Sequence, residues 1–154
     1  MVQSFTIFLT RRNEINLFDQ SLTEVQRKQF LAILSDSSLS EQQADDKIDG
    51  FINTLNDTQQ GWYKIIKERQ QLSIEAEKAF RLEKIAEMPQ SLQKIANEIE
   101  KVYDDRNISQ SDKKAKITEM KKLLPVEIRD ELFPVYANAP IIFILIAALL
   151  ARRG

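Results

Sequence analysis

Apolar residues recur every three or four positions over most of this chain, which is the spacing of amphipathic helices. One apolar stripe runs from 44 to 55, and a second runs from 92 to 103. Residues 62–88 between them are rich in Glu, Lys, Gln and Ala, which favour helix. The alternation of apolar and polar residues that marks strands does not recur. The pattern therefore predicts an all-α fold with a long central helix.

Serine residues mark the expected starts of three helices. Ser21 and Glu24 have the spacing of a capping box, in which each side chain bonds the other residue's backbone amide. Ser40 and Gln43 repeat that spacing, and Ser109 precedes another apolar stripe. We therefore expect helices to begin just after these serines.

Breaks delimit the long helix and a short last one. The polar run 56–58 followed by Gly61 predicts a break, so the long helix is expected over 62–88. Pro125 stands where a first-turn proline would, ahead of a short helix over 126–133.

Two stretches of the chain resemble each other without gaps. Residues 34–55 align with residues 103–124. Acidic, capping and apolar positions coincide, as in the pairs Asp36–Asp105, Ser40–Ser109, Ile48–Ile117 and Leu55–Leu124. Each stretch has the pattern of a helix end, a polar turn, a serine cap and a second helix. We predict two pseudo-repeated helix–turn–helix units joined by the long central helix, which is the layout of a binding scaffold.

The ends of the chain differ from its middle. We expect one helical domain over 14–133, preceded by an N-terminal segment (1–13) and followed by an apolar tail (134–154). The tail is expected to form a short apolar helix over 141–151. Such a helix spans only about 16 Å, whereas a bilayer core needs about 30 Å, so it cannot cross a membrane alone.

Burial of this tail against the core or a partner is the simplest interpretation. A contact with a membrane surface, a removed anchor signal and an aberrant gene end are the alternatives. The residues that would make a membrane or partner contact are Ile141, Ile142, Phe143, Ile144 and Leu145.

Composition excludes several kinds of chemistry. The chain has no histidine and no cysteine, so imidazole bases, thiolate nucleophiles, Cys/His metal sites and disulfides are ruled out. Its three separated glycines cannot form a phosphate-binding loop. A net charge of −1 provides no basic surplus for phosphates, so nucleic-acid binding is not expected. We predict a protein that is not an enzyme and requires no cofactor.

Acidic side chains suggest a site for a hard divalent cation, because magnesium and calcium prefer oxygen ligands. Some lie within one turn of a helix and others in the two polar turns; the candidates are Asp36, Asp45, Asp46, Asp49, Asp104 and Asp105. Neither turn has the glycine and the acid that a calcium-binding loop needs at its sixth and twelfth positions. Weak magnesium binding is the cation hypothesis, and a solvated helix face is its alternative.

Aromatic side chains suggest a second hypothesis, a cavity for a fatty acid or similar small apolar ligand. At helical spacing the same residues are expected to form ordinary core. They are Phe30, Phe51, Trp62, Tyr63 and Phe80.

Three motifs point to a known family. The polar turn is used twice, at 37–41 and 106–110, and the residues 60–63 (Gln-Gly-Trp-Tyr) precede a long charged helix. The closing run 124–132 is similar to a Leu-Pro-x-x-Val-Arg-x-Glu-Leu ending. In their order these motifs resemble the nematode SXP/RAL family of secreted antigens and allergens, over about residues 14 to 133.

The resemblance implies a small helical protein that is typically secreted, immunogenic and associated with cations, and in some members with lipids or host interaction. We therefore expect a non-enzymatic secreted protein that binds divalent cations weakly and acts through a host protein or a protein of its own kind. Carriage of an apolar ligand and membrane association through the tail are the alternatives. The chain departs from the family in its apolar tail and in its start, where the basic pair 11–12 follows the apolar run of a secretion signal instead of preceding it.

Overall fold

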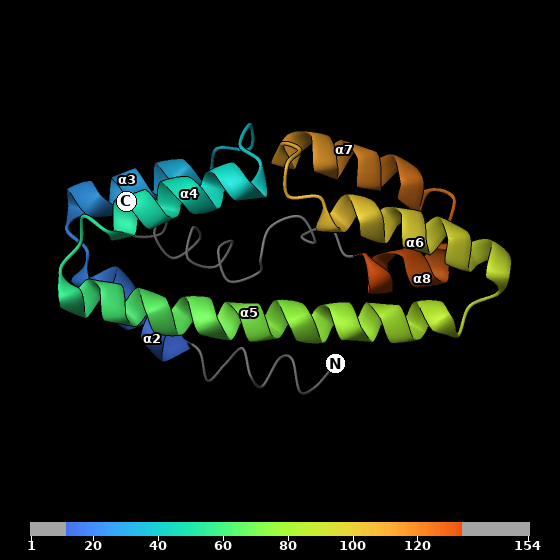
Figure 1. The fold of residues 1–154 in the computed structure, drawn as a ribbon, viewed down its shortest axis with the longest axis horizontal. Helices are drawn as coiled ribbons and strands as arrows, with labels where there is room; N and C mark the ends of the chain where they lie inside the picture. The colour runs from blue at the N-terminus through green and yellow to red at the C-terminus, as the bar shows by residue number, and fades with distance from the viewer. Residues whose placement is uncertain (1–11, 134–154) are drawn as a thin grey trace.

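Two layers of helices make up the part of the chain that the computed structural model describes, residues 12–133. A long helix, α5, forms one layer, and the two helical hairpins α3–α4 and α6–α7 lie end to end along it to form the other (Figure 1). Within these residues the helices are α2 (Arg12–Ser21), α3 (Glu24–Leu34), α4 (Glu41–Ile52), α5 (Asp57–Ala86), α6 (Gln90–Asp104), α7 (Gln110–Lys121) and α8 (Val126–Leu132). The predicted all-α fold is confirmed. The expected apolar C-terminal helix lies outside the described residues.

The long helix begins earlier than the sequence pattern predicted. Asn56 is its N-cap: the Asn56 side chain accepts from the Gln59 amide at 2.9 Å, and the Gln59 side chain accepts from the Asn56 amide at 3.0 Å. Gly61 lies inside the helix, so the break expected there is wrong. One helical glycine costs only about 1 kcal/mol relative to alanine, which a well-formed capping box can offset.

The first two helices also differ from expectation. The helix α2 was not predicted, although the buried residues Ile15, Phe18 and Leu22 have helical spacing. Ser21 is its last residue and not a cap, because its hydroxyl donates to the carbonyl oxygen of Phe18 at 2.6 Å. The capping box of α3 is instead made by Thr23 with its partner three residues on.

In the described part of the chain, two separate hydrophobic cores hold the layers together. The first core lies between α2, α3, α4 and the first half of α5, and consists of Ile15, Phe18, Leu22, Phe30, Ile48, Phe51, Ile52, Leu55, Tyr63 and Ile66. The second lies between the end of α5 and helices α6 to α8, and consists of Ile85, Ala96, Ile99, Ile117, Leu124, Leu132 and Phe133. The inward residues thus follow the predicted apolar stripes.

The turns of the two hairpins meet above the middle of α5 (Figure 1). Ser40 and Ser109 form an isolated antiparallel bridge there. The amide of Gln110 donates to Leu39 at 2.9 Å, the amide of Gln42 to Arg106 at 3.1 Å, and the amide of Ser111 to Ser37 at 3.0 Å, each to a carbonyl oxygen. We call residues 36–42 together with 105–111 the turn pair.

The turn pair matches the register of the sequence alignment. The two residues of the central bridge are an aligned pair, and the two outer hydrogen bonds correspond to each other in the same register. Helices α4 and α7 begin and end at aligned residues. Each follows a serine whose hydroxyl accepts a hydrogen bond from the backbone amide three residues later. The hairpins differ in length, because α6 has 15 residues and α3 has 11. A duplication of the whole unit stays a prediction.

Candidate cation site at the turn pair

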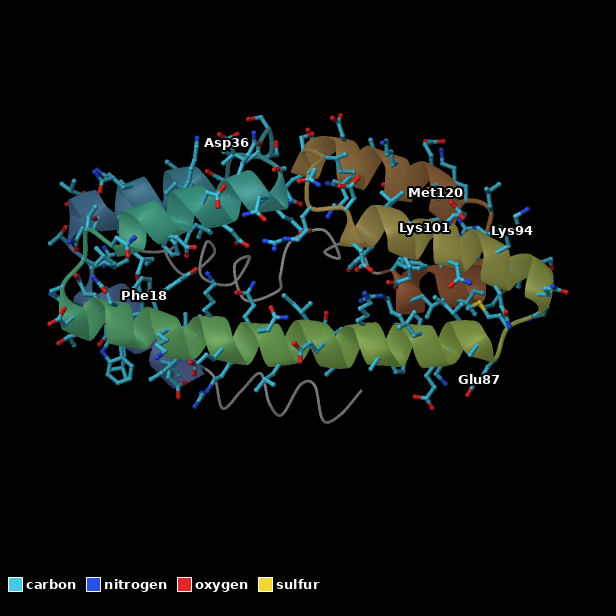
Figure 2. The ribbon with its side chains drawn as sticks, in the orientation of Figure 1. Phe18, Asp36, Glu87, Lys94, Lys101 and Met120 are labelled. Atoms are coloured by element: carbon cyan, nitrogen blue, oxygen red, sulfur yellow. The ribbon has the colours of Figure 1, made fainter. Side chains whose placement is uncertain are left out.

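Each turn contains one aspartate whose carboxylate accepts a hydrogen bond from the backbone amide two residues later. Oδ1 of Asp36 accepts from the Ser38 amide at 3.1 Å and from the Ser38 hydroxyl at 2.5 Å. Oδ1 of Asp105 accepts from the Asn107 amide at 2.9 Å. These bonds fix the turns ahead of the serine caps. Asp36 lies at the outer edge of the turn pair, away from α5 (Figure 2).

Hydrogen bonds from Ser38, through its side chain first and then its amide, lower the pKa of Asp36. The carboxylate is thus favoured in its charged form. Among the described residues neither Asp36 nor Asp105 forms an ion pair with a lysine or arginine. These two carboxylates are therefore open to an external cation.

The other candidate aspartates each interact with a side chain of the protein. On α4, Asp45 pairs with Arg106 of the opposite turn and Asp49 pairs with Lys67 at 3.0 Å. Asp46 accepts from the side-chain amide of Gln42 at 3.0 Å. At the end of α6, a lysine of α5 pairs with Asp104 at 2.6 Å. Within residues 12–133 no group of three or more acidic side chains is arranged to hold a metal ion.

Burial affects Asp45 more than its charged neighbours do. Desolvation raises the pKa of this carboxyl, while the Arg106 and Lys67 cations act in the opposite direction. A second carboxylate, Asp49, adds to the rise, so the two charges lie close enough to repel. Both already have a basic partner, which a bound cation would have to displace.

The turn pair also contains a buried lysine, which the sequence did not predict. Lys113 on α7 is 1% exposed, and its ammonium donates to Glu41 Oε1 at 2.6 Å and to the Tyr103 carbonyl oxygen at 3.0 Å. Arg106 lies 3.8 Å from the same glutamate. Lys113 and Glu41 are 72 positions apart, so no local pattern could pair them. These charges join the two hairpins.

The proposed apolar-ligand residues mainly form core. Phe30 stacks on Phe51 with centroids 5.4 Å apart and meets Tyr63 edge-on at 6.3 Å. Trp62 packs against this core partly buried, whereas Phe80 is 41% exposed. Phe30 thus contacts the rings of Phe51 and Tyr63, and all three side chains belong to the first core.

A shallow depression elsewhere lies along the start of α6. It is lined by Gln90, Ser91, Gln93, Lys94 and Asn97. No helix in the described part of the chain is long and apolar enough to span a bilayer. The tail residues 141–145 lie outside that part, so their membrane or partner contact stays a prediction.

Comparison with known proteins identifies the family of this chain. A family model described as "SXP/RAL-2 family protein Ani s 5-like, metal-binding domain" matches residues 5–135. No curated protein and no solved structure matches the chain. The matched stretch includes both hairpins, the long helix and the closing helix. The chain therefore belongs to the SXP/RAL-2 family, as the motifs predicted.

Proposed function

We propose that this protein is a non-enzymatic helical protein that binds a divalent cation weakly at its two turns, through Asp36 and Asp105. Membership of a family with a metal-binding domain supports cation binding. The observation that carries the choice of residues is that each turn carboxylate accepts from a backbone amide two residues on and, among the described residues, forms no ion pair. Lys47 helps to lower the pKa of Asp36 but does not pair with it.

Magnesium suits such a site better than calcium. Magnesium keeps several of its waters and often binds through one or two carboxylates, whereas calcium takes six to eight oxygen ligands. Each turn offers one carboxylate whose Oδ1 is already occupied by the turn, so the remaining ligands would be water. We therefore expect weak binding with little change in structure.

A magnesium titration followed through backbone amide NMR signals tests this proposal. We expect saturable shifts at 36–38 and at 105–107 in the millimolar range. Asp36→Asn and Asp105→Asn should each abolish the shifts of their own turn. Asp49→Asn is a control, because Lys67 already pairs with this helical aspartate at 3.0 Å, so its loss should leave both turns responsive. Unmoved turn signals, or shifts that survive both variants, would show that the cation does not bind there.

Secretion and action through a host protein, or through a protein of its own kind, remain part of the proposal, and they rest on the family alone. Carriage of an apolar ligand receives no such support from the described residues, because Phe30 packs against both Phe51 and Tyr63 within the first core.

A further inference from the structure

The middle of α5 separates the two cores. The last residue of α5 in the first core is Ile66, and the first in the second core is Ile85. The buried residues of α5 between them are polar, namely Gln70 and Arg81, while Leu72 is 63% exposed. Among the described residues, no apolar core therefore bridges the two ends of the long helix.

Among residues 12–133, the hydrogen bonds and ion pairs between the two hairpins all lie at the turn pair, where Leu39 is the one buried apolar side chain. In residues 12–133, the hydrogen bonds between the hairpin α3–α4 and the hairpin α6–α7 are the three backbone bonds of the turn pair and the side-chain bonds of Arg106 and Lys113. The ion pairs are those of Arg106 with Asp45 and Glu41, and that of Lys113 with Glu41. Beyond this contact, α5 is the described element that joins the two hairpins.

The ion pairs of the turn pair differ in their exposure to solvent. The side chain of Arg106 is 48% exposed, so salt screens its attraction to Asp45 and Glu41. The ammonium of Lys113 is buried and has Glu41 as its only anionic partner among the described residues. Loss of that partner would leave a buried charge without compensation. Glu41 therefore faces both cations and is the central residue of the contact.

We propose that the turn pair is a releasable junction, which opens while both cores stay folded and which Glu41 holds closed. Opening would break the three backbone bonds, expose the Lys113 ammonium to water and let the two hairpins move independently about α5. Local opening of this kind occurs where few apolar contacts support exposed hydrogen bonds. In the turn pair Leu39 is the one buried apolar residue, and the residues of the two outer bonds are exposed. The chain would then behave as two folded units under electrostatic control, a property that does not depend on cation binding.

Native-state hydrogen exchange tests the junction directly. The reporters are the amides of Gln42, Gln110 and Ser111, which cross the junction, and those of Ile66 and Ile99 in the two cores. Removing one charge with Glu41→Gln should speed exchange of the junction amides about tenfold and leave the core amides within about twofold. Raising the salt concentration should act in the same direction on the wild-type chain.

A matched control removes an ion pair elsewhere. Glu24 pairs with Lys28 on the exposed face of α3 at 3.1 Å, so Glu24→Gln should leave the junction amides unchanged. Lys113→Met is a second way to remove the contact with Glu41 and should also speed junction exchange. If junction and core amides exchange at one common rate in the wild type and in both junction variants, the protein is one cooperative unit and the proposal is overturned.

The distance between the hairpins gives an independent measurement. The chain has no cysteine, so spin labels can be placed by Lys47→Cys and Lys116→Cys, two exposed and aligned positions on α4 and α7. A narrow distance distribution in the wild-type background should broaden when Glu41→Gln is added. Unchanged distributions at low and high salt would contradict the opening.

Discussion

Arg81 and Glu100 form an ion pair that is almost completely buried between α5 and α6. Each side chain is 7% exposed, and the guanidinium carbon of Arg81 lies 4.3 Å from the ring centre of Tyr103. The second carboxylate oxygen, Oε2, of Glu100 has no hydrogen-bond partner in the described structure. Such a pair contributes little net stability, but losing one member leaves the other charge buried.

We therefore expect Arg81→Met to destabilise the protein by about 3 kcal/mol, because it leaves the Glu100 carboxylate buried without a cation. Adding Glu100→Leu should recover most of this loss. Urea unfolding followed by circular dichroism measures both values. The control is Lys101→Met, which removes an exposed partner of Glu98 and should change stability by less than about 0.5 kcal/mol. An equal loss in the single and double variants would contradict this account.

Residue-scale chemistry could be predicted from the sequence only where the partners are local. The bond from Ser38 to Asp36 lies within one polar turn, which the sequence marks as a turn; cation binding by the turn aspartates stays a prediction. The partners of Asp45 and Asp49 come from a distant turn and from another helix, so the expected helical cluster could not be judged in advance. Long-range pairing depends on the packing of the helices, which local periodicity does not contain.

Helices were predicted best where an apolar stripe and a cap agreed. The starts of α4 and α7 after Ser40 and Ser109 are confirmed. The beginning of α5 was predicted too late, because Gly61 was interpreted as a break while the capping box at Asn56 was not recognised. A cap specifies hydrogen bonds, whereas one helical glycine only lowers a propensity, so the cap determined the boundary.

The surroundings of Gly61 in α5 leave room for a side chain. A Cβ atom built on Gly61 meets nothing within 4 Å, and its backbone φ is negative, so Gly61→Ala introduces no clash. Alanine also has fewer unfolded conformations, so the substitution should stabilise the protein by about 0.5–1 kcal/mol in thermal or urea unfolding. Gly50→Ala on α4 has the same surroundings and should act in the same direction. A loss of stability in both variants would show that the helices require flexibility at these positions.

At the scale of the whole molecule, the sequence predicted two helical hairpins and a connecting helix but not how the hairpins meet. The meeting point consists of backbone bonds between turns that are far apart in the chain, such as that from Gln42 to Arg106. Backbone bonds of this kind leave no pattern in side-chain type. The separation into two cores follows from α5, whose inward residues change from apolar to polar between Ile66 and Ile85.

Two cores joined by a polar junction should respond separately to damage. Phe30 is fully buried and contacts three other rings, so Phe30→Ala should cost the first core about 3–5 kcal/mol. Exchange protection should fall at Ile66 and remain largely unchanged at Ile99, because the second core shares no residue with the first. Ile99→Ala should give the opposite pattern.

The exposed ring of Phe80 provides the control, since Phe80→Ala should leave both cores protected. An equal loss of protection at both reporters after either core substitution would mean that α5 transmits unfolding along its whole length, and that the molecule has a single cooperative unit despite its divided core.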